Sequence, residues 1–234
     1  MAQGKGVCSM QLPISDRLLA CAQYIRPKDV VADVGCDHGY LGIYLLNHGI
    51  AQRVLASDIN EGPLLSAQRN ARKYGVSGKM SFHLCPGVAD VPREFDVMVC
   101  AGMGADTIIS ILEDAPWLQD STYRLVLQCQ SKTPLLRRYL SEKGWYIEQE
   151  CVLRDGRFLY TVMEVIWKPD APRLTVGQWY IPSALRCNAY PETAEYVFRV
   201  LEGLQLAVSH QNNPEKKQAL EELEKIYPPE EKSL

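Results

Sequence analysis

One short stretch, residues 30–40, constrains the fold of this chain more than any other part of the sequence. Residues 30–34 are apolar except for Asp33 and rich in β-branched side chains, which predicts a strand buried on both faces. Gly35 and Gly39 follow, and the next apolar residues predict the start of a helix. Glycines let a ligand approach the backbone closely, and a helix N-terminus presents free N–H groups. This order of strand, glycine turn and helix predicts a nucleotide-binding site.

Two carboxylates indicate which cofactor would bind there. Asp58 ends a second apolar run, residues 53–58, and in a doubly wound sheet it would lie where it accepts both hydroxyls of an adenosine ribose. Asp33 precedes Gly35, and a carboxylate there repels a diphosphate but can hold a cation. The glycine spacing also lacks the G-x-G-x-x-G pattern of dinucleotide sites. These features favour S-adenosylmethionine, which has an ammonium and a sulfonium but no phosphate, over a tight turn without a ligand.

Composition and charge exclude several classes of partner. The net charge of −3 supplies no general basic field, so any RNA contact must use a local basic patch. The eight cysteines are scattered without a C-x-x-C pair, which indicates buried thiols in a reducing cytosol and no metal site. The first residues do not resemble a signal peptide, and no uncharged run reaches the ~20 residues that a membrane helix needs. We expect a cytoplasmic protein with no membrane contact.

The sequence up to residue 167 alternates between strand and helix patterns. A first helix begins after Ser15 and is stopped by Pro27, and later helices are expected at residues 64–74, up to about 114 and from 134. Further strands are expected at residues 80–84, 96–101 and 124–129, followed by a hairpin of residues 146–153 and 157–167. Parallel strands followed by an antiparallel pair predict an α/β fold with a Rossmann-like class I methyltransferase sheet. Most dinucleotide-binding folds instead add a sixth parallel unit.

The last part of the chain carries only helix patterns. Residues 168–172 read as a linker, so we expect a cofactor-binding domain at 1–168 and a small helical domain at 173–227. Apolar residues recur at helical spacing over 194–208 and 219–226 with a break at 212–214, and a shorter helix is expected near Pro182. This pattern predicts an antiparallel, coiled-coil-like helical hairpin. Its apolar stripe is more typical of intramolecular packing than of a dimer seam, which favours a monomer or a weak dimer.

These motifs together resemble the bacterial tRNA (adenine(22)-N1)-methyltransferase family. The resemblance covers residues 15–227 and rests on residues 33–41 (D-V-G-C-D-H-G-Y-L), 101–104 (A-G-M-G), 16–18 (D-R-L), 127–131 (L-Q-C-Q-S) and the helical C-terminal part. It implies methyl transfer from S-adenosylmethionine to N1 of an adenine in the D-arm of tRNA.

The chain departs from the family pattern at three positions. Ala105 replaces the last glycine of a G-M-G-G motif, and Cys129 replaces a proline after the fifth strand. Pro86 replaces an aspartate that commonly accepts from the adenine amino group, and proline offers neither a side-chain acceptor nor an N–H. Pro86 keeps open a second hypothesis, an RNA-binding protein that retains the fold without catalysis. A nicotinamide-dependent oxidoreductase is a third, which the absent dinucleotide pattern disfavours.

The site residues follow from the turns at the strand ends. Asp37 and His38 lie where the methyl group would emerge, and Asp37 is expected to orient the target adenine. His38 could assist catalysis, although a loop histidine is more often a hydrogen-bonded structural residue. Residues expected to bind the cofactor are Asp33, Gly35, Gly39, Asp58, Ile59, Ala101, Gly102 and Met103. Residues expected to contact tRNA are Arg17, Tyr40, Gly104 and Lys132, with Lys216 and Lys217 of the helical part as more distant contacts.

Overall fold

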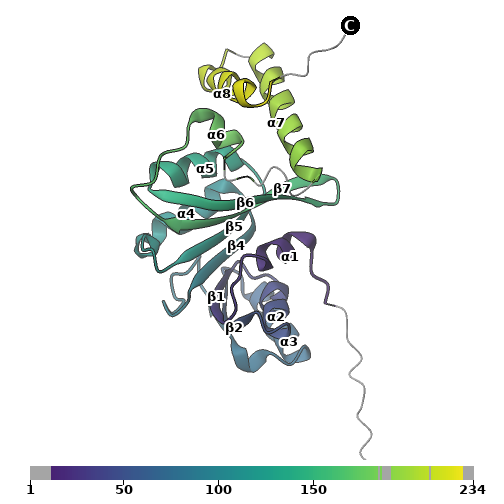
Figure 1. The fold of residues 1–234 in the computed structure, drawn as a ribbon. Helices are drawn as coiled ribbons and strands as arrows, with labels where there is room; N and C mark the ends of the chain where they lie inside the picture. Colours follow the sequence, from purple (N-terminus) through teal and green to yellow (C-terminus); the bar gives the residue numbers. More distant parts are fainter. Residues whose placement is uncertain (1–11, 184, 186–190, 211, 229–234) are drawn as a thin grey trace, which may run out of the picture.

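The computed structural model describes residues 12–183, 185, 191–210 and 212–228, and its centre is a mixed sheet (Figure 1). The seven strands lie in the order β3-β2-β1-β4-β5-β7-β6. The first five are parallel, and β7 pairs antiparallel with both β5 and β6, which confirms the predicted sheet. The strands are β1 (Asp29–Val34), β2 (Ala51–Asp58), β3 (Met80–Leu84), β4 (Val97–Met103), β5 (Arg124–Cys129), β6 (Trp145–Asp155) and β7 (Phe158–Trp167).

Helices cover both faces of the sheet. The helices are α1 (Asp16–Ala22), α2 (Tyr40–Asn47), α3 (Glu61–Lys73), α4 (Ala105–Asp114), α5 (Thr133–Glu142), α6 (Val176–Tyr180), α7 (Pro191–His210) and α8 (Pro214–Ile226), with 3-10 turns at Ser77–Lys79 and Pro116–Leu118. Val31 packs in a core with residues of α1, α2 and α3, whereas its neighbour Ala32 packs in a second core with residues of α4 and α5. Successive side chains of a strand point to opposite faces, so these strands are apolar on both.

The order of the strands determines where a ligand can bind. From β1 the chain proceeds to β2 and β3 on one side, and the later strands β4 and β5 lie on the other side. A crevice opens at the carboxyl ends of the strands where the order reverses, and open α/β sheets bind their ligands there. The glycine turn after β1 lies at this point.

The helical C-terminal part packs on the far edge of the sheet (Figure 1), which confirms the predicted helical appendage. Its core joins Leu204 of α7 and Leu223 of α8 to Val152 of β6. Arg137 of α5 is fully buried, pairs with Glu150 of β6 and donates to the backbone carbonyls at the end of α6. A buried guanidinium needs such partners, so this contact anchors the helical part to the sheet.

Two boundaries differ from the predictions, and one expected helix falls outside the described residues. A short helix was expected to begin near Pro182, and residues 184 and 186–190, over which it would run, are not among the residues that the structure describes. The short helix α6 lies before that position, where Thr175 and Gln178 form a capping box. Helix α1 ends at Ala22, well before Pro27. Strand β4 continues through Gly102 to Met103 with an irregular register, where a turn was expected. Within the described residues six cysteines are buried and free, as predicted, and Cys8 and Cys187 lie outside them.

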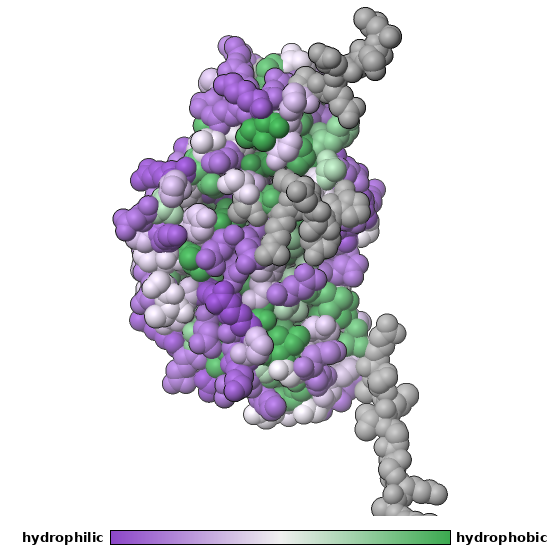
Figure 2. All heavy atoms as spheres, viewed as in Figure 1, coloured by the Kyte–Doolittle hydropathy of each residue, from purple (hydrophilic) through white to green (hydrophobic). Residues whose placement is uncertain are grey.

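Figure 2 shows hydrophilic side chains over most of the visible face, with apolar side chains in small groups between them. No described helix combines the length and the apolar character needed to cross a membrane. In the same part of the chain, no three metal-binding side chains come together at one point.

Candidate active site

Two adjoining hollows lie along the carboxyl ends of the strands. The larger hollow, about 780 Å³, is bordered by the end of β2, residues 85–89 and one face of α4. The smaller hollow, about 390 Å³, is bordered by α1, the turn after β1 and the ends of β4 and β5. Gly35 and Met103 border both. Gly35 has a φ of +66°, and a Cβ added there would lie 2.3 Å from Met103 Cε, so Met103 covers this glycine and marks the boundary between the hollows.

Asp58 and Ile59 give the larger hollow the properties of an adenosine site. The backbone N–H groups of Asn60 (2.9 Å) and Asp37 (3.2 Å) each donate to one carboxylate oxygen of Asp58. Each oxygen can accept a further hydrogen bond, which two vicinal ribose hydroxyls could donate. Ile59 is 68% exposed at the edge of the hollow, and a large apolar side chain in that position can be covered by a purine ring. Asp58 and Ile59 thus lie where the sequence predicted a nucleoside.

The loop after β3 lies opposite them and is held firmly. Ser57 Oγ donates to the carbonyl of Gly87 (2.7 Å), and the N–H of Cys85 donates to the carbonyl of Asp58 (3.1 Å). Pro86 borders the hollow in this loop. Because proline has no polar side chain, the loop offers only backbone acceptors to an adenine amino group.

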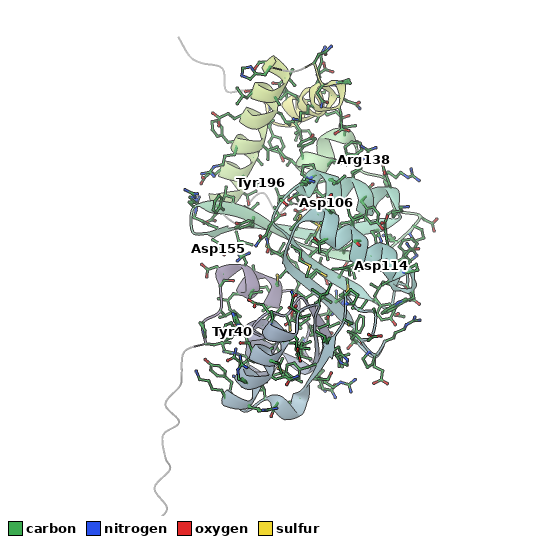
Figure 3. All side chains as sticks on the ribbon, turned by 180° about the vertical axis from the view of Figure 1, so that it is seen from behind. Tyr40, Asp106, Asp114, Arg138, Asp155 and Tyr196 are labelled. Atoms are coloured by element: carbon green, nitrogen blue, oxygen red, sulfur yellow. The ribbon has the colours of Figure 1, made fainter. Side chains whose placement is uncertain are left out.

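Helix α4 presents polar side chains to the same hollow. Asp106, Ser110 and Asp114 border it, and their spacing of four residues places them on one face of the helix (Figure 3). Their oxygens are acceptors at the edge of this hollow, where Pro86 offers none from its side chain. No role was predicted for them, although a repeat of polar residues every four positions was a visible signal.

Asp33 is a buried acidic residue at the edge of the smaller hollow. Its side chain borders that hollow but is only 5% exposed as a residue, and its Oδ2 has no hydrogen-bond partner among the described residues. Burial raises the pKa of Asp33 to about 7. The nearby Asp58 carboxylate also raises this pKa, whereas the hydrogen bond from the N–H of Gly42 lowers it. A buried carboxylate with one oxygen unpartnered is costly, so a cationic group bound there would be favoured. The α-ammonium of S-adenosylmethionine meets this requirement, and the residues present therefore fit the predicted cofactor.

Asp37 and His38, in the turn between β1 and α2, differ in exposure and in their contacts. Asp37 has a φ of +47° and a side chain that is 68% exposed, and its Oδ1 lies 3.6 Å from His38 Nε2. His38 Nδ1 lies 3.0 Å from Ser66 Oγ, and its ring lies 5.6 Å from that of Tyr40. All three predicted residues border the smaller hollow. Asp37 is the more available to a substrate, whereas the contacts of His38 are those of a structural residue.

Gln128 and Gln130 border the smaller hollow without having been assigned a role from the sequence. Gln128 is fully buried, and its Oε1 accepts from the N–H of Gly102 (2.9 Å). This bond holds the irregular end of β4 beside Ala101 and Met103. Gln128 lies in β5 and Gln130 directly follows its last residue, Cys129, so two polar residues at the carboxyl end of a strand were the available signal.

The remaining predicted residues lie at different distances from the hollows. Arg17 of α1 borders the smaller hollow, and its Nε donates to Asp155 Oδ2 (2.5 Å) in the hairpin turn. Gly39 and Gly104 cap the N-termini of α2 and α4 and do not border either hollow in the described structure. Lys132 also lies outside both, with its Nζ 2.7 Å from Asp106 Oδ2.

Comparison with known proteins agrees with this geometry. Residues 14–163 match a family described as a methyltransferase domain. The chain belongs to this methyltransferase family. A tRNA (adenine(22)-N(1))-methyltransferase of Bacillus subtilis is 34% identical to it over 155 residues, which are 65% of each chain.

Solved structures agree with the same assignment. The Bacillus subtilis M1A22 tRNA methyltransferase TrmK superposes with a TM-score of 0.75 at 26% identity, covering 92% of this methyltransferase and 96% of that chain. A Streptococcus pneumoniae protein in complex with S-adenosyl-L-methionine superposes with a TM-score of 0.79 at 28% identity, covering 89% and 98%. The resemblance predicted from the motifs is therefore confirmed.

Proposed function

We propose that this methyltransferase transfers a methyl group from S-adenosylmethionine to N1 of an adenine in the D-arm of tRNA, at position 22. The observation that carries the proposal is the buried, unpartnered oxygen of Asp33 beside a hollow that also contains the exposed carboxylate of Asp37. Such a pair suits a cationic methyl donor and an acceptor base that gains positive charge. The names of the Bacillus subtilis relatives supply the tRNA and the position.

The proposed cofactor site uses both hollows. Asp58 would accept from the ribose hydroxyls and Ile59 would cover the adenine in the larger hollow. Asp33 would accept from the ammonium, and the remaining contacts would come from the backbone around the boundary between the hollows: Gly35, Gly39, Ala101, Gly102 and Met103. The bound cofactor supplies a methyl group on a positively charged sulfur, which already is a good leaving group.

The protein would then act mainly by positioning and electrostatics. The N1 lone pair attacks directly, so no proton must be removed first, and most of the acceleration comes from holding the two reacting atoms in line and about 3 Å apart. Positive charge moves onto the adenine, so Asp37 would stabilise the transition state and accept from the N6 amino group. N1 lies on the Watson–Crick edge, so the base must leave its stack, and Tyr40 would support it there.

The tRNA would lie across the smaller hollow. Arg17, Gly104 and Lys132 would contact it near the reacting base, and His38 would assist Asp37. The proposed division into residues 1–168 for the cofactor and 173–227 for a helical part places all cofactor contacts in the first domain. A tRNA substrate places the reaction in the cytoplasm, and the packing of α6, α7 and α8 against one another and against β6 favours a monomer or a weak dimer.

The alternative is an RNA-binding protein without catalysis, and Pro86 is the observation that favours it. The experiment is incubation of bulk unmodified tRNA with methyl-labelled S-adenosylmethionine, followed by nucleoside mapping. We expect label in 1-methyladenosine at position 22. Binding of tRNA without transfer of label would instead support the non-catalytic hypothesis.

A further inference from the structure

The tip of the hairpin formed by β6 and β7 carries cations and aromatic rings that the proposed reaction does not use. Phe158 is the first residue of β7 and is 50% exposed. The guanidinium carbon of Arg157 lies 4.9 Å from the centre of its ring. No carboxylate of the described residues pairs with Arg157. An exposed phenylalanine beside an unpaired arginine at a turn has no role in packing the core.

This pair continues as a row toward the smaller hollow. Phe158 and Tyr160 stand on the same face of β7, and their ring centres are 6.1 Å apart. The guanidinium of Arg17 lies 5.5 Å from the centre of the Tyr160 ring. Arg17 borders the smaller hollow, so the row Arg157, Phe158, Tyr160 and Arg17 leads from the hairpin tip to the proposed site of methyl transfer. Figure 3 shows Asp155 at this tip, next to α1 and on the same side of the molecule as Tyr40.

The charges at the tip favour an anionic partner. Asp155 is the one carboxylate in the turn, and it is paired with Arg17. Arg154 is paired with Glu195 of α7, and as the cross-strand partner of Leu159 it belongs to the other face of the hairpin. Arg157 therefore remains available at the open end of the row. Alternating cations and exposed rings are how proteins hold unpaired nucleotides, because bases stack on the rings while phosphates meet the cations.

We infer that the hairpin tip is a second RNA contact, where an unpaired nucleotide beside the target adenine stacks on Phe158 and its phosphate meets Arg157. The inference rests on the proposed tRNA substrate. It names a specific role for the tip: the stacked nucleotide holds the neighbouring target base out of the helix and over the smaller hollow.

The test compares the two ends of the same hairpin. Phe158→Ala should raise both the Kd and the KM for an unmodified tRNA transcript roughly tenfold, because stacking on an aromatic ring contributes that much per base. Phe158→Trp should restore binding, and neither variant should change the affinity for S-adenosylmethionine. Tyr146→Ala is the matched control. The Nζ of Lys168 lies 5.0 Å from the centre of the Tyr146 ring, so this ring also has a cation beside it. Tyr146 lies at the opposite end of the two strands, roughly 25 Å from Phe158.

A salt titration separates stacking from charge. Arg157→Gln should lower the slope of log K against log salt by about one unit, whereas Phe158→Ala should leave the slope unchanged. Equal tRNA affinities of Phe158→Ala and wild type, or equal losses in Phe158→Ala and Tyr146→Ala, would overturn the inference. If wild type and Phe158→Ala methylate tRNA equally well, the inference about the hairpin tip is wrong but the proposed function stands. Wild-type protein that methylates no tRNA would contradict the proposed function itself.

Discussion

The two hollows of the candidate active site hold their carboxylates in opposite ways. Asp58 in the larger hollow accepts two backbone hydrogen bonds, so it is satisfied before any ligand arrives. Asp33 at the smaller hollow is buried with an unpartnered oxygen and has a pKa of about 7. A satisfied carboxylate recognises neutral hydroxyl groups by geometry, whereas an unsatisfied one recognises charge. In the proposed cofactor site, one part of the cleft would therefore select the shape of a nucleoside and the other would select a cation.

The largest effect is expected in the larger hollow. Asp58→Ala should weaken S-adenosylmethionine binding by roughly 2–4 kcal/mol, since hydrogen bonds to a charged group contribute about 1.5–3 kcal/mol each and are not additive. Calorimetric titration measures the affinity, and Asp58→Asn, which retains one acceptor, is the control. Equal affinity in the alanine variant and wild type would remove the ribose assignment.

The next effect separates catalysis from binding in the smaller hollow. Asp37→Ala should lower kcat on the order of 100-fold with little change in cofactor affinity, because its carboxylate acts on the charge that develops in the transition state. Asparagine tolerates the positive φ of this position, so Asp37→Asn tests the charge without disturbing the turn. A loss confined to cofactor affinity would assign Asp37 to the cofactor site instead.

Replacing Asp33 tests charge recognition directly. Asp33→Asn should weaken S-adenosylmethionine binding by about 1.5–3 kcal/mol, because the ammonium loses its charged partner. Sinefungin, which has an amine where the cofactor has its sulfonium and keeps the same ammonium, should lose a similar amount. A neutral adenosine fragment should bind equally to both proteins, and a loss for adenosine would show that Asp33 shapes the larger hollow too.

The pH dependence of folding stability and of cofactor affinity has a sign that follows from the burial of Asp33. The pKa of Asp33 is raised from 3.8 to about 7 in the folded protein, so its contribution to stability is complete below pH 4 and is lost as the pH rises through 7. The loss amounts to about 4 kcal/mol, measurable by urea unfolding of wild type against Asp33→Asn without cofactor. Cofactor affinity should change in the opposite direction and rise roughly 25-fold between pH 5.5 and 7.5, as the ionised fraction of Asp33 increases. A pH-independent affinity would contradict an ionised Asp33 as the ammonium partner.

The smallest effect is expected outside both hollows. Lys217 is exposed on α8 and Lys216 is half-buried there, so Lys216→Gln with Lys217→Gln should weaken tRNA binding only a few-fold and leave cofactor affinity unchanged. Deleting the helical part is a harsher test, because it would remove the carbonyl partners of the buried Arg137. Filter binding at two salt concentrations measures the effect. Unchanged tRNA binding would assign the helical part to stability alone.

The sequence predicted the sheet, the glycine turn and the two acids because these depend on local patterns. Apolar runs of strand length, glycines at the turn and the acids that border them are readable from neighbouring residues. Adjacent first and second strands then bring Asp33 and Asp58 to one edge without further information. The short helix α6 was not predicted, although the T-x-x-Q spacing of Thr175 and Gln178 is a local capping pattern.

Only the tertiary structure determines the contacts between residues that are far apart in the chain. Arg17 and Asp155 are 138 positions apart, and their contact depends on how the hairpin turn lies over α1. The polar face of α4 opposite Pro86 depends on how that helix packs on the sheet. The row from Phe158 to Arg17 likewise combines a strand face with a helix from the other end of the chain. Local patterns determine which elements form, but the packing of a complete core determines which of their faces meet.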